Sequence, residues 1–204
     1  MDEKIQFSLQ DRIRGVTIPK QRSLKLAEFL GIMIGDGNLT DTRKGRKYTY
    51  QIAISGSTLD DINHHRYIQA IFKDLFSIRF KESHLRKHEA RLRTYSKGIF
   101  NYLSLQGLHQ GSKHTATGIP SSINSCNKLL KMAFLRGILD MDGCLKFAAK
   151  DKSKLHKYPI IKIGLENKSY VNDIANLLHT LEFKFYIVYN EKAHDYRSNK
   201  VHLK

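Results

Sequence analysis

The chain has few cysteine and proline residues and no tryptophan. Its 204 residues include two cysteines, three prolines and no tryptophan. Cys126 and Cys144 are too few for a disulfide framework or a four-thiolate zinc site, which favours a reducing compartment such as the cytoplasm or an organellar matrix. No apolar stretch approaches the ~20 residues of a membrane span, and the charged opening residues lack the apolar core of a signal peptide. We expect a folded protein that does not enter a membrane.

Acidic residues are also scarce relative to basic ones. The chain has 35 Lys and Arg against 19 Asp and Glu, which gives a net charge of +16. This excess predicts a polyanionic partner, most commonly nucleic acid. Because the basic residues are spread along the chain rather than gathered in a tail, they indicate a folded binding surface.

Several motifs of other activities are missing. The chain has neither a P-loop nor a GxGxxG sequence. A calcium loop built on DMDG would begin at Ile138 and end at Ala149, and neither side chain can bind a cation. His84 and His88 are four residues apart, but they fall in a predicted strand and lack the Glu of a zinc-protease helix.

Two segments of the chain are nearly copies of each other. Residues 27–39 read AEFLGIMIGDGNL and residues 133–145 read AFLRGILDMDGCL. Each is an apolar run with an internal glycine that ends in Asp-Gly, at Asp36 and at Asp142. The duplication predicts a pseudo-symmetric protein with an N-terminal arm and two halves: residues 1–22, 23–126 and 127–204.

Local patterns predict the same order of elements in both halves. In the first half we expect helices at 24–35, 59–76 and 97–105, a hairpin at 37–55, and strands at 78–86 and 90–95. In the second half we expect helices at 127–141 and 170–181 and strands at 144–149, 158–165, 184–189 and 200–204. The second half has no counterpart of the helix at 97–105.

The two acidic helix ends predict a bound cation. An aspartate in the last turn of a helix is destabilised by the partial negative charge there, and the repeat does this twice. Two carboxylates and free helix-end carbonyls suit a hard ion such as Mg²⁺ or Mn²⁺. Small residues recur every four positions in both segments, which lets helix backbones approach closely: Ala27, Gly31, Gly35, Ala133 and Gly137. We expect these helices to pack together and to juxtapose Asp36 and Asp142.

The sequences FLGIMIGDG (29–37) and LRGILDMDG (135–143) resemble the signature helices of the single-chain LAGLIDADG homing endonucleases. The passage from Gly107 through Lys113 to Pro120 is similar to the connectors of that family. The resemblance implies an α+β fold of two pseudo-symmetric αββαββα halves packed through the two motif helices, with antiparallel sheets forming a DNA-binding saddle. The last helix would be missing from the C-terminal half.

The resemblance also implies a function. It implies a monomeric, site-specific endonuclease that cuts both strands of a long asymmetric DNA target by divalent-metal-dependent hydrolysis, and that is intron-encoded or free-standing. The alternative is a binding-only relative, either a maturase acting on intron RNA or a decayed nuclease.

The residues that the resemblance implies for metal binding lie at the two helix ends: Asp36, Asp142, and the carbonyls of Gly35 and Met141. Lys113 and Lys146 are candidates to assist cleavage, with ordinary phosphate contact as the alternative. Related enzymes often carry Gln or Asn at the end of the strand that follows each motif helix. This chain departs from that pattern with Gly56 and Leu165.

Strand alternation places basic side chains on one face of each predicted sheet. In EARLRTY, the basic and aromatic residues alternate with Ala90, Leu92 and Thr94. Such faces predict contact with phosphates and with the major groove, against the alternative of a solvated face. The candidate DNA contacts are Arg43, Lys44, Arg46, Lys47, Arg91, Arg93, Tyr95, Lys162, Lys200 and His202.

The missing last helix predicts that the second half is poorly covered. Side chains on its last strands should then be partly exposed, namely Phe185, Ile187, Val201 and Leu203. Either the arm at 1–22 covers them, or this half is loosely held, or the chain is a truncated and inactive copy. We expect a loosely held second half with reduced cleavage activity.

Overall fold

The chain has an α+β fold with antiparallel sheets, as the sequence predicts. A computed structural model describes residues 5–44, 47–57, 61–86, 89–148, 158–189, 192–195 and 200–203. Within these ranges the helices are α1 (Leu9–Ile13), α2 (Leu24–Gly35), α3 (Ile62–Phe76), α4 (Lys97–Leu105), α5 (Lys128–Asp142) and α6 (Lys168–Thr180). None of these helices combines the length and apolar character that a bilayer crossing requires.

In the part of the chain that the structure describes, the strands divide into three antiparallel sheets. The first contains β1 (Gly37–Lys44), β2 (Lys47–Ser57), β3 (Lys81–Arg86) and β4 (Glu89–Tyr95), in the order β1-β2-β4-β3. The second pairs β5 (Gly143–Ala148) with β6 (Tyr158–Ile163), and the third pairs β7 (Lys192–Asp195) with β8 (Lys200–Leu203). Short 3-10 turns at Lys113–Thr115 and Ser121–Ile123 punctuate the connector between α4 and α5.

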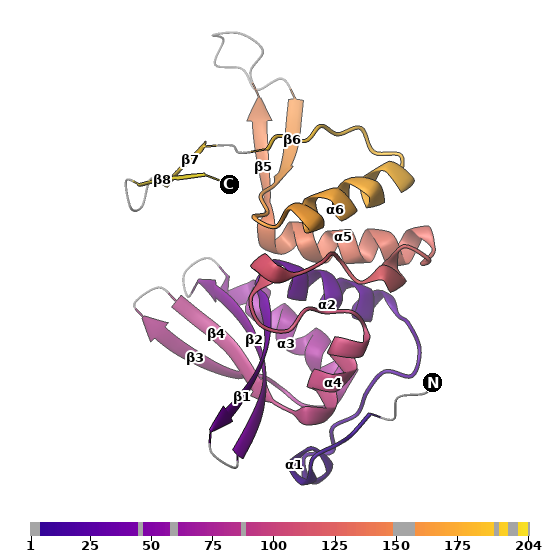
Figure 1. The fold of residues 1–204 in the computed structure, drawn as a ribbon, viewed down its shortest axis with the longest axis vertical. Helices are drawn as coiled ribbons and strands as arrows, with labels where there is room; N and C mark the ends of the chain where they lie inside the picture. Colours follow the sequence, from indigo (N-terminus) through magenta and orange to yellow (C-terminus); the bar gives the residue numbers. More distant parts are fainter. Residues whose placement is uncertain are drawn as a thin grey trace.

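Helices α2 and α5, which carry the two copied segments, lie side by side at the centre of the molecule (Figure 1). Each begins at a side-chain cap, where Ser23 Oγ accepts from Leu26 N (3.2 Å) and Asn127 Oδ1 accepts from Leu130 N (3.0 Å). These caps satisfy amide groups that have no partner in the first turn. The hydrophobic core is built around this pair and includes Phe29 and Phe134.

The first sheet separates an inner from an outer face. Along β4, Ala90, Leu92 and Thr94 are buried, whereas Arg91 and Arg93 are partly exposed. This alternation is the one that the sequence predicts, because side chains of period two leave opposite faces of a strand.

The second half reproduces the start of the repeat. Gly37 pairs with Ile54 in the first sheet, and Gly143 pairs with Ile163 in the second. The helix–hairpin unit α2-β1-β2 therefore recurs as α5-β5-β6, with Leu145 in the place of Leu39 and Ile161 in the place of Ile52.

The remaining strands of the second half differ from the expectation. Residues 184–189 have no regular secondary structure, and the last hairpin is formed by β7 and β8, apart from β5 and β6. Phe185 and Ile187 are 41% and 39% exposed, so their segment lacks the cover that stabilises β3 and β4. The side chains of Val201 and Leu203 lie outside the described part of the chain.

The N-terminal arm packs on the first half, which is against the alternative that it covers the second half and leaves the expected one, a loosely held second half. The buried Asp11 carboxylate accepts hydrogen bonds from Gly98 N (3.0 Å) and from Ser8 N (2.9 Å). Arg14 Nη1 donates to Tyr95 O (2.8 Å), and the Phe7 ring lies against Gly98. The arm also contains a short helix, α1, which the sequence analysis did not predict.

Candidate functional site

The site begins with the close approach of α2 and α5. A Cβ added to Gly31 would overlap the carbonyl oxygen of Phe134, and one added to Gly137 would overlap that of Glu28. Ala27 and Ala133, on the same stripes, are buried. Glycine at these two positions is therefore required by backbone contact between the helices.

This contact brings the acidic ends of the two helices together. A Cβ at Gly35 would overlap the Met141 side chain and would lie 3.2 Å from Oδ2 of Asp142. Asp36 follows Gly35 directly. The two aspartates also occupy matching backbone positions, because Asp36 O accepts from Ser55 N (3.2 Å) and Asp142 O accepts from Gly164 N (3.3 Å).

Lys113 supplies a positive charge at this meeting point. Its Nζ donates to the carbonyl oxygen of Gly35, and its charge is attracted by both Asp36 and Asp142. Burial lowers the pKa of Lys113, and the two carboxylates oppose that shift. Burial likewise raises the pKa of Asp36, Lys113 opposes this rise, and nearby Asp61 adds to it. Both groups are thus partly desolvated, and each favours the charge of the other.

Asn167 holds the loop that carries Lys113, a role that the sequence analysis missed. Its Nδ2 donates to the carbonyl oxygens of Lys113 (2.7 Å) and Ala116 (2.9 Å). Its Oδ1 also accepts from Ser169 N (2.8 Å) as the N-cap of α6. An Asn before a predicted helix indicates a cap, but the partner loop is too far away in sequence to be predicted.

The second candidate lysine is placed differently. Lys146 is exposed on β5, and no described contact brings it to either aspartate. Of the two candidate lysines, only Lys113 of the connector places its charge beside Asp36 and Asp142. The two helix ends match each other, but the lysines do not.

Helix α3 contributes further polar groups beside Asp36 that the sequence analysis did not select. Asp61, His64 and His65 all act electrostatically on the Asp36 carboxylate. The adjacent histidines at the start of the predicted helix were visible in the sequence, but no local pattern indicates that α3 begins beside Asp36.

The donor set at the helix ends is compatible with a hard divalent cation. Asp142 Oδ2 lies close to Gly35, Asp36 is the next residue of that helix end, and the Gly35 carbonyl accepts from Lys113 Nζ. The Met141 carbonyl remains a predicted ligand. Burial raises the pKa of Asp36 because the anion loses hydration, and a cation beside it, as Lys113 already is, stabilises the anion. In the described ranges no group of three or more His, Cys, Asp and Glu side chains gathers as a denser metal site.

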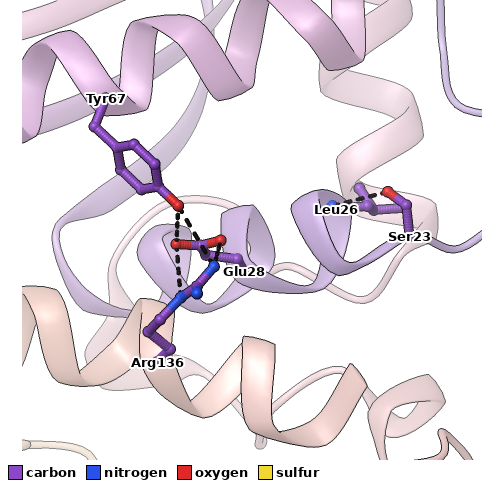
Figure 2. A network of polar contacts seen from close by, with 5 residues as sticks. All are labelled: Ser23, Leu26, Glu28, Tyr67 and Arg136. Atoms are coloured by element: carbon purple, nitrogen blue, oxygen red, sulfur yellow. Dashed lines mark hydrogen bonds and ion pairs between the residues drawn. The ribbon is translucent and has the colours of Figure 1, made fainter. Parts of the chain in front are cut away.

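A polar network connects helices α2, α3 and α5 (Figure 2). The buried carboxylate of Glu28 on α2 accepts from Tyr67 Oη of α3 (2.7 Å) and from Arg136 Nε of α5 (3.0 Å). Arg136 Nη2 also donates to the second carboxylate oxygen. Because a guanidinium and a carboxylate pair in one plane, this contact limits rotation of α2 against α5.

Arg91, Arg93 and Tyr95 lie on the outer face of the first sheet. Arg43 pairs with Tyr48 and shares a face with Leu39, so it lies on the opposite face of the sheet. Arg93 lies 5.8 Å from the ring centre of Tyr95, and Arg43 lies 5.4 Å from that of Tyr48. Arg91 is 3.5 Å from Glu89, and Lys162 is partly exposed on β6. Arg46 lies outside the described residues, as do the side chains of Lys44, Lys47, Lys200 and His202.

Comparisons of sequence give limited information. No protein-family model matches the chain. Among curated proteins it is 28% identical over 198 residues to the replication factor C small subunit of Methanocaldococcus jannaschii, a match that covers 84% of this chain and 10% of that protein. The chain thus spans about a tenth of the length of that relative.

Comparison of structures identifies the fold as that of the LAGLIDADG homing endonucleases. I-DmoI in complex with DNA and Mn has a TM-score of 0.54 at 20% identity, covering 86% of this chain and 85% of that one. A mesophilic variant of I-DmoI gives a TM-score of 0.54 at 20% identity, covering 77% and 76%. The meganuclease I-SmaMI bound to uncleavable DNA gives 0.52 at 15% identity, covering 86% and 77%.

Proposed function

We propose that the chain is a site-specific DNA endonuclease of the homing type, which cuts both strands of a long asymmetric target by divalent-metal-dependent hydrolysis. The observation that carries the proposal is the junction of the Asp36 and Asp142 helix ends beside Lys113. Structures with this fold contain DNA together with Mn or Ca, which supports DNA as the partner and a divalent ion as the cofactor.

Each residue of the junction has a proposed role. Asp36, Asp142 and the carbonyls of Gly35 and Met141 would hold Mg²⁺ or Mn²⁺, and the ion would share the Gly35 carbonyl with Lys113 Nζ. Such an ion would supply activation of water and neutralisation of charge on a phosphate. Lys113 offsets the negative charge that two carboxylates and a phosphate create together. Lys146 contacts the DNA backbone away from the junction.

The outer faces of the sheets are the proposed DNA-binding surface. Guanidinium and ammonium groups there neutralise phosphates, and those reaching the major groove distinguish bases. We also propose that the boundary between the two halves lies at residue 126. One chain is proposed to act as a monomer, because it contains both aspartates. The gene is proposed to belong to a mobile element such as an intron.

A two-stage experiment tests this function. Duplexes are first selected for binding from a randomised library in EDTA, then incubated with the full chain in Mg²⁺, Mn²⁺ or EDTA. We expect both strands of a selected duplex to be cut at defined positions only with metal. Asp36→Asn with Asp142→Asn should lower the cutting rate by at least about a thousandfold, since removal of metal ligands eliminates the activation of water.

The same assay decides between cutting and the binding-only alternative. That alternative is favoured by Gly56 and Leu165, which give neither strand end a polar side chain. A wild-type chain that binds selected duplexes but leaves them intact in every metal would contradict the nuclease. Tighter binding to structured RNA than to duplex DNA would then favour a role on intron RNA.

A further inference from the structure

Gly56, near the end of β2, leaves a space beside Asp36 that a histidine occupies. Ser55, the preceding residue, donates its amide to Asp36 O. A Cβ added to Gly56 would overlap Nε2 of His65 and would lie 3.2 Å from Oδ2 of Asp61. The imidazole of His65 therefore fills the volume that a side chain at position 56 would take.

The His65 ring is buried and firmly placed. Its residue is 2% exposed, and its Nδ1 lies 3.7 Å from Oε1 of Glu82. The first turn of α3 is fixed to the strand end, since Ser57 N donates to Asp61 Oδ2 (2.6 Å) and His65 N donates to Asp61 O (2.7 Å). Neither ring nitrogen has a hydrogen-bond partner within the described part of the chain.

An unpartnered polar atom in a protein interior is unfavourable, and a catalytic role or a bound water or ion is among the reasons for keeping one. The Nε2 atom faces the strand end beside Asp36, and His65 acts electrostatically on the Asp36 carboxylate. The ring nitrogens of histidine can each accept or donate one hydrogen bond. His65 is thus suited to orient a small polar molecule, such as water, at the Asp36 side of the junction.

Among the described residues, the positions on the Asp142 side that match Gly56 and His65 carry other side chains. The strand registers place Leu165 in the position of Gly56. The N-caps of α3 and α6 are Asp61 and Asn167, which places Val171 in the position of His65. Both counterparts are apolar, so the two sides of the junction differ in chemistry although their helix ends match.

We propose that His65 is a positioning residue for one of the two strand cuts, with its Nε2 orienting the water used on the Asp36 side. The inference rests on the proposed nuclease function. It predicts that replacing His65 lowers the cutting rate of one DNA strand much more than that of the other.

Three substitutions test the role of the Nε2 atom. The His65→Leu side chain has no polar atom, whereas the His65→Asn amide can reach only the Nδ1 position and the His65→Gln amide can reach the Nε2 position. A selected duplex is labelled on each strand, and single-turnover rates are measured for both strands in Mg²⁺. Val171→Leu serves as the matched control, and binding in EDTA verifies that each variant is folded.

We expect His65→Leu and His65→Asn to slow the cutting of one strand about tenfold or more, as the loss of one oriented hydrogen bond would. The cutting rate of the other strand should stay within about twofold of wild type, nicked DNA should accumulate, and His65→Gln should cut both strands at the wild-type rate. Equal slowing of both strands, unchanged rates in His65→Leu and His65→Asn, or equal rates for His65→Asn and His65→Gln would overturn the proposal while leaving the nuclease function intact. A wild type that cuts neither strand would overturn that function and this inference with it.

Discussion

Lys113 is the residue that connects the two acidic helix ends. Its ammonium group contacts the Gly35 carbonyl and is attracted by both aspartates, although burial lowers its pKa. A charged group is kept in such a place when opposite charges compensate for lost hydration. Lys113 therefore stabilises a pair of carboxylates that would otherwise repel each other.

Replacing this lysine should leave the repulsion between the Asp36 and Asp142 carboxylates uncompensated. We expect Lys113→Met to lower the Tm in EDTA by about 3–8 °C, the effect of losing one charged hydrogen bond in a protein of this size. Added Mg²⁺ should raise the Tm of the variant more than that of the wild type, because the ion replaces the missing positive charge. Differential scanning calorimetry measures both values. Lys146→Met, at an exposed position on β5, should change neither, and equal metal shifts in all three proteins would contradict the assignment.

Helices α2 and α5 form the element that determines the geometry of the site. Gly31 and Gly137 let their backbones touch, and the Glu28–Arg136 pair limits their relative rotation. The arm, by contrast, stabilises the far end of the first half, where Asp11 joins α1 to the start of α4.

The arm contact predicts a dependence on pH. Burial raises the pKa of Asp11, but hydrogen bonds from Ser96, Ser8 and Gly98 outweigh it and leave the pKa below its ordinary value of 3.8. Because the folded protein favours the anion, this contribution is present above pH ~3.8 and is lost as the pH falls through the lower folded pKa. We expect Asp11→Ala to lower the free energy of unfolding at neutral pH by about 1–3 kcal/mol.

Urea denaturation at several pH values measures this contribution. The difference between wild type and Asp11→Ala should shrink below pH ~3.8. Asp74→Ala is a control for the size of the effect, because Lys25 also lowers the pKa of the Asp74 carboxyl but does so at an exposed position. Solvent screening should make the contribution of this surface pair small at every pH. A difference for Asp11 that stays constant down to the most acidic condition would contradict the role of the anion.

The two halves of the molecule share a repeat but differ in how deeply its apolar side chains are buried. Leu39 and Ile52 are 1% and 0% exposed, whereas their counterparts Leu145 and Ile161 are 58% and 63% exposed. Since fully burying such a side chain contributes ~1.5–3 kcal/mol, the second sheet has much less stabilisation. The expectation of a more loosely held second half follows from this difference.

Hydrogen exchange measures that difference directly. We expect amides of β5, β6 and residues 183–189 to exchange well before those of β1, β2 and β4, because opening them exposes little additional apolar surface. If the sheets contact DNA, binding a selected duplex should reduce the difference in exchange rate between the two sets of strands. Equal protection of the two hairpins in the free protein would contradict the prediction.

The sequence by itself determined the features that depend on neighbours along the chain. Period-two alternation predicted the two faces of β4, the local pattern predicted a helix at 24–35 where α2 forms, and the Asp-Gly pairs marked where α2 and α5 end. The segment at 184–189 was predicted as a strand from its β-branched and aromatic residues, but a strand also needs a partner, which its composition cannot supply.

Only the tertiary structure decided the contacts between distant segments. It placed Lys113 at the aspartates and Lys146 on an exposed strand, docked the arm on α4, and set His65 beside Asp36. These outcomes depend on the path of the loops and on which apolar surfaces pack against each other. The physical reason is that a local pattern reports the periodicity and turn chemistry of its own residues, whereas the position of a partner far along the chain is determined by packing of the whole core.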